Sequence, residues 1–222
     1  MPVRFVPAAL LAPVLAPVLA LAAAAAPLAA QGSPATSTTS AGATTAAPVT
    51  GVRTFAIDRA HSEITFRIRH MMSRVSGTFG EWTGTITADP AQLAAGAVNV
   101  DIKTASIDTR QPRRDTHLRS ADFFAADSFP AITFRSRQVR VQGDSLHILG
   151  DLTIRGITKP VTLDGEFLGA DGQPGKRRIG FAARTRINRL DYGVKWNRGL
   201  EAGGVVLGDD VDIEVNVEAV EQ

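Results

Sequence analysis

The stretch Val211-Asp212-Ile213-Glu214-Val215-Asn216-Val217-Glu218 alternates apolar and polar side chains without a break. A period of two is the pattern of a β-strand that buries one face and exposes the other to water. Similar alternation marks further segments that we also predict as strands, at residues 54–58, 63–69, 82–88, 98–103, 132–135, 146–154, 161–167 and 179–187. About eight or nine such strands predict an all-β domain.

Short connections between these strands indicate an antiparallel sheet. Gly143-Asp144 and residues 170–172 lie between apolar runs, where tight turns need residues that accept a positive φ. No helical crossover separates the strands, so neighbours along the chain are expected to pair. A sandwich or a barrel would satisfy this pattern. Glycines on the apolar faces favour a barrel with bends or internal room, and such a barrel can hold a small ligand; they are Gly84, Gly150 and Gly165.

The first thirty residues are expected to lie outside the fold. They hold one charged residue, Arg4, followed by a long run of Ala, Leu and Val that ends in small residues. This pattern is typical of a secretory signal peptide, which we predict at residues 1–30 with cleavage near Ala30. An uncleaved membrane anchor is the alternative, but four prolines disfavour a stable spanning helix. We therefore expect a periplasmic or secreted protein with no stable membrane span after cleavage.

Composition divides the remainder into a linker and one domain. Residues 31–50 are rich in Ser, Thr, Ala, Pro and Gly and carry no charge, so we predict a disordered linker. Residues 51–222 have the size of a single domain. Removing Arg4 from the 24 basic residues leaves 23 against 22 acidic ones, which is no electrostatic footprint for nucleic acid. The chain has no cysteine, so no disulfide framework supports the domain.

A dense polar and aromatic insert at residues 113–124 interrupts the strands. Its charge density is typical of a functional loop on a β scaffold. We predict a short helix near residues 115–125, capped by Asp115. One face of that helix would be buried and would carry His117, Ala121 and Phe124. The other face would carry residues spaced for ion pairs, namely Asp115, Arg119 and Asp122.

The alternation also predicts which polar side chains face inward. His70 is in phase with the apolar residues of its strand and should point inside, whereas His147 is out of phase and should be exposed. Arg189 is in phase with Ile187, and a buried cation is costly unless it is paired or solvated. Two alternatives stay open for Arg189: a solvated loop residue beyond the strand, or a partner for the polar head of a ligand at the barrel mouth.

Motifs for catalysis and metal binding are missing from the sequence. It has no His-x-His or His-Glu-x-x-His spacing, no Gly-x-Ser-x-Gly elbow, no phosphate loop and no dinucleotide fingerprint. His61, His70 and His117 are therefore interpreted as structural histidines rather than metal ligands, and we predict no catalytic residue. The aromatic run at residues 192–197 is expected to plug one end of the barrel, with a mobile lid as the alternative.

Several motifs together resemble the YceI family over residues 53–220. They are Asp58-x-x-His61-Ser62, Gly77-x-Phe79, Ser106-Ile107-x-Thr109, Arg114-Asp115-x-His117-Leu118, Phe123-Phe124, Phe129-Pro130, Phe134-x-Ser136, Gly150-x-Leu152-Thr153-Ile154-x-Gly156 and Asn188-Arg189-x-Asp191-Tyr192-Gly193. Tyr192 stands where the family usually has Phe. The combination is specific, although each motif alone would be weak.

The resemblance implies an extended, lipocalin-like antiparallel β-barrel with a long apolar cavity. It implies binding of a long-chain amphiphile, such as an isoprenoid quinone, a polyprenyl chain or a fatty-acid derivative, and no other cofactor. It also implies a bacterial periplasmic or secreted location and a possible homodimer. No agreed catalytic activity accompanies the family.

An apolar chain would be held by ordinary core side chains, at roughly 0.8 kcal/mol per buried methylene. Only the head group needs polar partners. Our candidate ligand-binding residues are Phe66, His70, Arg114, His117, Phe123, Phe124, Phe134, Phe181, Arg189 and Trp196, with the two histidines and two arginines at the head-group end. Two other hypotheses stay open: an enzyme that acts on such a lipid with His70 or His117 as acid–base, and a stress-response or structural module with a filled lumen.

Overall fold

The computed structural model describes residues 51–173, 175–199 and 206–222. The signal peptide and linker predicted at residues 1–50 lie outside this part, in which no helix is long and apolar enough to cross a membrane. The strands are β1 (Arg53–Ile57), β2 (Glu63–His70), β3 (Ser73–Phe79), β4 (Trp82–Ala88), β5 (Ala97–Lys103), β6 (Ile107–Asp108), β7 (Ala131–Gln142), β8 (Ser145–Ile154), β9 (Ile157–Asp171), β10 (Arg178–Asn188) and β11 (Leu207–Glu221). The helices are α1 (Pro112–Arg119) and the short 3-10 helices η1 (Arg59–His61), η2 (Leu93–Ala95), η3 (Thr104–Ser106) and η4 (Arg189–Tyr192).

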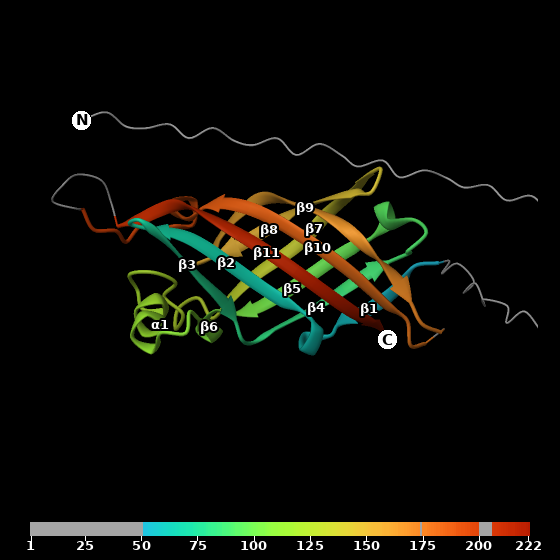
Figure 1. Cartoon of the computed structure of the whole chain (residues 1–222), viewed down its shortest axis with the longest axis horizontal. Helices are drawn as coiled ribbons and strands as arrows, with labels where there is room; N and C mark the ends of the chain where they lie inside the picture. The colour runs from blue at the N-terminus through green and yellow to red at the C-terminus, as the bar shows by residue number, and fades with distance from the viewer. Residues whose placement is uncertain (1–50, 174, 200–205) are drawn as a thin grey trace, which may run out of the picture. The chain divides into compact units, whose positions relative to one another are not determined.

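The strands close into a barrel. Neighbours pair antiparallel in the order β1-β4-β5-β7-β8-β9-β10-β11, and β1 pairs back with β11 to complete a ring of eight strands (Figure 1). This ring confirms the predicted all-β antiparallel barrel with a short helix. The sheet continues from β11 through β2 and β3 to β6. Figure 1 places α1 and β6 at one end of the domain, and β1 and the C-terminus at the other.

One edge of β11 serves two strands in succession. β1 pairs with its C-terminal residues and β2 with the residues before them. The joint between β1 and β2 is the Asp58-x-x-His61-Ser62 motif, which Asp58 opens by accepting a hydrogen bond from the backbone N–H of Ala60. The Asp58 backbone N–H and the Ser62 hydroxyl both donate to the carbonyl of Glu218, at 2.8 and 3.1 Å. The motif therefore fixes where one strand ends and the next begins along β11.

The predicted alternation is confirmed in most strands, but β3 and β6 were not predicted. β3 reads Ser-Arg-Val-Ser-Gly-Thr-Phe, so only Val75 and Phe79 are large and apolar, and the period of two is obscured. A side chain at Gly77 is excluded because a Cβ there would approach Cζ of Phe66 to 2.5 Å. The ring of a β2 residue thus supplies the apolar contact that β3 lacks.

Contact with an aromatic ring also explains why position 150 is a glycine. A Cβ on Gly150 would lie 2.5 Å from Cζ of Phe134 on the paired strand β7. The internal room that the sequence predicted at this glycine is therefore occupied by an aromatic side chain. Its neighbours on the same face of β8 are buried: Leu146, Ile148, Leu152 and Ile154.

The insert forms a helix, but it begins earlier than predicted and ends sooner. α1 starts after Gln111, whose side-chain oxygen accepts from the backbone N–H groups of Arg113 and Arg114. The prediction that Asp115 caps the helix is wrong, because Pro112 suits the first helical position and places the cap before it. The helix ends at Arg119 with Ser120 as C-cap, so Ala121 and Phe124 lie in the turns that follow rather than on its buried face.

The predicted row of ion pairs along this helix is also wrong. Asp115 is buried and accepts hydrogen bonds from the backbone N–H and the hydroxyl of Thr109. Arg119 donates to the carbonyls of Ala105 and Ile107 instead of to an acidic side chain. These bonds anchor α1 to the chain around β6. A helix this short is marginal on its own, so it depends on such tertiary contacts.

Candidate functional site

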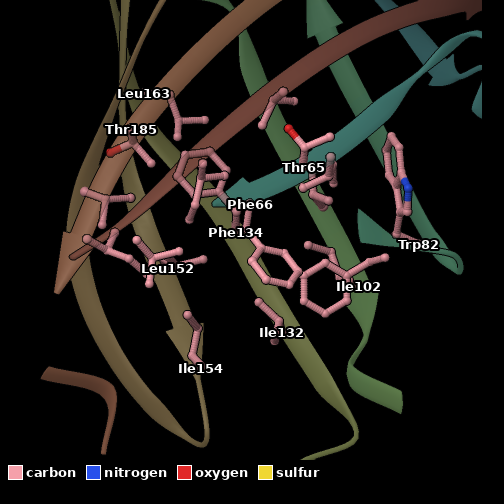
Figure 2. Close-up of a pocket in the computed structure, with 18 of the residues that line it drawn as sticks. Thr65, Phe66, Trp82, Ile102, Ile132, Phe134, Leu152, Ile154, Leu163 and Thr185 are labelled. Atoms are coloured by element: carbon pink, nitrogen blue, oxygen red, sulfur yellow. The ribbon is translucent and has the colours of Figure 1, made fainter. Parts of the chain in front are cut away.

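The barrel encloses a cavity of about 690 Å³. Its wall is mostly aliphatic and aromatic, and Figure 2 shows side chains from several strands pointing into it. Leu163, Phe181 and Ile213 lie on inner faces and line this cavity, yet they are only half-buried. Core side chains normally leave few voids larger than a water molecule. The half-buried inner residues therefore show that side chains do not fill the lumen.

Charged and ring-nitrogen side chains that line the cavity come mainly from one end. Arg113, Arg114 and His117 lie on α1, and Trp196 follows η4. His70, the last residue of β2, pairs with Leu207. The end of the cavity bordered by α1 and residues 192–197 is the cavity mouth. At the opposite end the lining residues near β1, β4 and η2 are apolar apart from Thr87, namely Ile57, Ile86, Ala88, Leu93, Ala97, Val98 and Val217.

Three rings meet at the mouth. His117 packs edge-on against Phe123 and Trp196, with ring centres 5.0 and 5.1 Å apart, and the rings of Phe123 and Trp196 lie 5.1 Å from each other. Nε2 of His117 also lies 2.9 Å from Oδ2 of Asp122. The trio joins α1, the turn after it and the loop after η4, so segments far apart in the sequence build this side of the cavity together.

A second aromatic row leads from the insert into the barrel. The ring centre of Phe124 lies 6.3 Å from that of Phe79, which in turn lies 5.7 Å from that of Phe66. All three line the cavity. Phe79 was named only as part of a family motif, and it connects the two residues that were predicted to bind a ligand.

Arg189 is buried and bonded to the protein. Only 5% of the residue is exposed. Its Nε donates to the carbonyl of Gly208 at 2.8 Å, and Nη1 donates to the carbonyls of Val194 and Trp196 at 2.6 and 2.9 Å. Nη2 lies 3.2 Å from Oδ1 of Asp209. Burial lowers the pKa of the Arg189 guanidinium. The solvated-loop alternative is therefore wrong: Arg189 holds the loop that carries Trp196.

The same loop accounts for two further features of the mouth. Tyr192 is buried, and its hydroxyl has no hydrogen-bond partner within the described part of the chain. Burial raises the pKa of Tyr192 to about 12. Val194 packs with Phe123 and Leu207 in a small apolar cluster. Residues 192–197 thus contribute packed aromatic and aliphatic side chains to this end of the barrel, as expected of a plug.

All ten side chains predicted to bind a ligand line the cavity, which brings together residues from 66 to 196. Phe134 and Phe181 lie on strand walls, and the ring centre of Phe181 is 5.1 Å from that of Phe167. Arg114 donates from Nε and Nη2 to the hydroxyl and carbonyl of Thr109, at 2.7 and 2.9 Å. That these residues contact a ligand stays a prediction.

Sequence reasoning missed other lining residues. Gln111 and Arg113 both line the mouth, and Arg113 lies in the insert but was not selected as a candidate. Its position next to Arg114 was the available signal. Trp82 on β4 and Thr185 on β10 line the wall, as Figure 2 shows. The phase of Thr185 with Ile187 was the signal for the latter.

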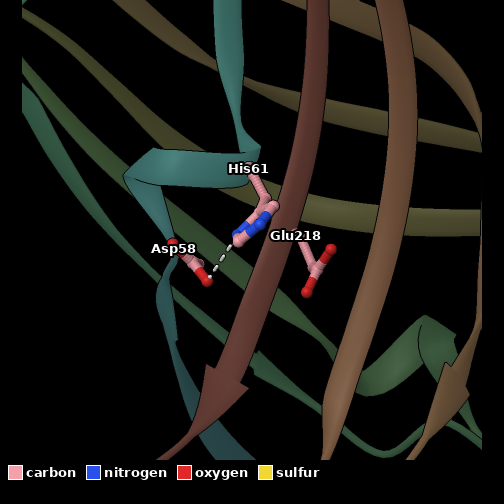
Figure 3. A group of neighbouring side chains, drawn as sticks. All are labelled: Asp58, His61 and Glu218. Carbon is pink, nitrogen blue, oxygen red and sulfur yellow. Dashed lines mark hydrogen bonds and ion pairs between the residues drawn. The ribbon is translucent and has the colours of Figure 1, made fainter.

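A separate polar cluster lies at the joint between β1 and β2. Asp58, His61 and Glu218 offer ligand atoms within 4.8 Å of one another (Figure 3). Nδ1 of His61 lies 3.0 Å from Oδ2 of Asp58. Arg178 donates to the same Asp58 oxygen at 2.8 Å and also pairs with Glu218. A guanidinium thus already occupies the position between the two carboxylates that a cation would take.

The pKa of Asp58 supports the interpretation that this cluster is held together by an ion pair with Arg178. The hydrogen bond from Arg178, followed by that from His61, lowers the pKa of Asp58 to about 2. The carboxylate is therefore charged at neutral pH and matched by an arginine. Within the described residues, His70 and His117 belong to no comparable group of three possible metal ligands. His61 is hydrogen-bonded as a structural histidine would be.

Comparison with known proteins places the barrel in a family. Residues 55–219 match the YceI-like domain family. Protein YceI from Shigella flexneri is 42% identical over 164 residues, which cover 73% of this chain and 83% of that protein. The family match over residues 55–219 includes both the joint and the segments that line the cavity.

Solved structures share the same fold. The YCEI protein of Campylobacter jejuni superposes with a TM-score of 0.60 at 32% identity, covering 68% of this chain and 88% of that one. A polyisoprenoid binding domain from Saccharophagus degradans, implicated in plant cell wall breakdown, superposes with a TM-score of 0.55. It is 15% identical, and the match covers 76% of this chain and 98% of that one. At this identity the likeness concerns the fold alone.

Proposed function

The chain belongs to the YceI-like domain family, and we propose that it binds an isoprenoid-like or other long-chain amphiphilic lipid in the barrel cavity. The observation that carries the proposal is the unfilled apolar lumen with a polar mouth at one end. A volume of about 690 Å³ lies within the range of small-molecule sites. Burial of an alkyl or prenyl chain would stabilise the complex by roughly 0.8 kcal/mol per methylene before the costs of binding.

The proposed class of lipid is prompted by a structural neighbour. The domain from Saccharophagus degradans with the same fold is a polyisoprenoid binding domain. An apolar wall recognises chain length and width rather than specific atoms, so a prenyl chain and a fatty chain are both compatible with it. Head-group recognition falls to the polar residues of the mouth, where His70, Arg114 and His117 line the cavity.

We also propose that the protein is exported from the cytoplasm. The pattern of residues 1–30 supports secretion to the periplasm or to the medium, where a carrier would move a lipid through water. Cell fractionation and N-terminal sequencing of the mature protein test this. Recovery in the cytoplasm with residues 1–30 intact would contradict it, and the elution volume of the same preparation tests the predicted homodimer.

Extraction of the purified protein tests lipid binding directly. The full chain, produced in a lipid-replete bacterial host, should release a long-chain lipid into organic solvent, and mass spectrometry should identify it. Repeated extractions without lipid, together with no uptake of added lipid, would contradict binding. Incubation with the same lipid tests the enzyme hypothesis, because a carrier returns the lipid with its mass unchanged.

A further inference from the structure

The charges that line the cavity have one sign. Three arginines line it, Arg113, Arg114 and Arg189, together with His70 and His117. No aspartate or glutamate lines it within the described residues. An unbalanced cation beside an apolar cavity is costly unless it reaches water or an anionic partner. The positive charge of the lining side chains therefore affects which ligand the mouth accepts.

Two of the three arginines have donors to spare. Arg189 uses Nε and both terminal nitrogens on backbone carbonyls and Asp209, so it is committed to the loop. Arg114 uses Nε and Nη2 on Thr109, and its Nη1 makes no hydrogen bond in the described part of the chain. The Arg113 side chain is exposed and makes no hydrogen bond there either.

The acidic side chains in the insert and on β6 beside it already interact with other protein groups. Asp115 is buried and accepts from Thr109. Asp122 pairs with His117, and Asp108 accepts from the backbone N–H of Arg110. None of the three lines the cavity. Arg113 thus has no carboxylate partner among the described residues, and Arg114 reaches the Asp115 carboxylate only through the shared hydroxyl of Thr109.

We infer that the lipid carries an anionic head, a carboxylate or a phosphate, held at the mouth by Arg113 and Arg114. This inference rests on the proposed function and specifies its ligand. Arginine binds such groups through charge-assisted hydrogen bonds, which are stronger than those to a neutral alcohol or quinone oxygen. The tail then runs from the mouth toward the apolar end near β1 and η2, where Ile57 and Leu93 line the cavity. A cationic head would meet like charge at the same place.

A set of probes with one tail and different heads tests the inference. Geranylgeraniol, geranylgeranyl phosphate and geranylgeranylamine are titrated into the full chain. Intrinsic fluorescence reports binding, because both tryptophans of the chain, Trp82 and Trp196, line the cavity. The phosphate should bind about tenfold to a hundredfold more tightly than the alcohol, and the amine should bind most weakly. Oleate against oleyl alcohol is the parallel pair that separates a carboxylate site from a phosphate site.

Substitutions of the two arginines test whether they cause the preference for an anionic head. Arg113→Gln should lower the affinity for the phosphate much more than the affinity for the alcohol, so that the preference for the phosphate shrinks. Arg114→Gln should shrink this preference as well. Arg113 is the cleaner test because its side chain holds no other part of the fold. Arg184→Gln is the matched control, since Arg184 is exposed on β10 and does not line the cavity.

The outcomes separate the two proposals. If the alcohol binds as tightly as the phosphate and oleate, or if Arg113→Gln and Arg184→Gln behave alike, the anionic head is wrong although lipid binding stands. If none of the probes binds, lipid binding itself fails, and the inference fails with it.

Discussion

Two charged clusters of this domain are built from the same kinds of side chain, yet they differ in what they border. At the mouth, His117 Nε2 lies 2.9 Å from Asp122 Oδ2, and at the joint, His61 Nδ1 lies 3.0 Å from Asp58 Oδ2. Each histidine belongs to a motif that resembles the family, Asp58-x-x-His61-Ser62 or Arg114-Asp115-x-His117-Leu118. The joint borders the backbone of β11 and water, whereas His117 lines an unfilled apolar cavity. Density of charge therefore does not identify a binding site; adjacency to unfilled volume does.

The two clusters also differ in how their charges are paired. At the joint, the guanidinium of Arg178 pairs with both carboxylates, so the cluster is complete without a ligand. At the mouth, Arg113 and Arg114 face a cavity whose described lining contains no acid. The first arrangement stabilises a fold, and the second leaves interactions available to a guest.

The largest effect on stability should come from Arg189, which supports the mouth. Arg189→Met removes the donors to the carbonyls of Val194, Trp196 and Gly208 and leaves them buried without partners. Each orphaned polar group costs on the order of 1–3 kcal/mol, so we expect a loss of about 3 kcal/mol in the free energy of unfolding. Urea unfolding followed by circular dichroism measures it.

The control for this change lies on β10, the strand that leads into η4. Arg186 is exposed on β10, and its Nε lies 2.6 Å from Oδ1 of Asp212. Arg186→Met removes a surface ion pair and should therefore have a much smaller effect. Equal losses for the two variants would show that the mouth loop does not depend on the buried arginine.

Filling the cavity should abolish ligand binding without unfolding the barrel. Ala183 on β10 lines the cavity, so Ala183→Trp places an indole where a lipid tail would lie. We expect affinity for a long-chain lipid to fall at least about a hundredfold, equivalent to roughly 2.7 kcal/mol. Ala182→Trp is the control, because the neighbouring residue points to the outer face. Undiminished binding by Ala183→Trp would place the ligand outside the barrel.

The fold could be predicted from the sequence where the alternation is clean. β8 from Leu146 to Ile154 and β11 from Val211 to Ala219 carry apolar residues or glycine at every second position, so strand, face and phase follow from the sequence. β3 could not be predicted, since Gly77 makes sense only beside the ring of Phe66 on the paired strand. The predicted start of the helix was wrong because Gln111 caps it. Asp115 is the more usual type of capping residue, but its carboxylate accepts a hydrogen bond from Thr109 instead.

The candidate site was predicted by phase and by likeness to a family, and its limits follow from that. Phase places Phe134, Phe181 and His70 inside, and all three line the cavity. Phase cannot describe irregular segments, which is why the fate of Arg189 stayed open. Its three backbone acceptors belong to residues 5 to 19 positions further along the chain, and only the folded loop brings them together.

A smaller effect is expected from Tyr192, the buried residue of the mouth whose hydroxyl lacks a partner within the described residues. Tyr192→Phe removes an unsatisfied polar atom and keeps the ring. The free energy of unfolding should rise by about 1 kcal/mol, because the desolvation cost of the hydroxyl disappears. Urea unfolding of the lipid-free protein checks it. A decrease in stability would show that the hydroxyl makes a bond in solution.

The smallest effect should appear at the joint, and it should fade in acid. The hydrogen bond from Arg178 holds the pKa of Asp58 at about 2, below its ordinary value of 3.8. A carboxyl whose pKa is lowered by folding stabilises the native state above the ordinary value, and this contribution is lost as pH falls from about 4 to about 2. Asp58→Asn should lower stability at neutral pH and flatten the acid limb of a stability profile measured by thermal unfolding. It should leave lipid affinity unchanged, whereas Arg113→Gln should alter affinity and leave the acid limb as it is. An Asp58→Asn variant that binds lipid differently would show that the joint and the mouth are coupled, and the separation between a structural and a binding cluster would fail.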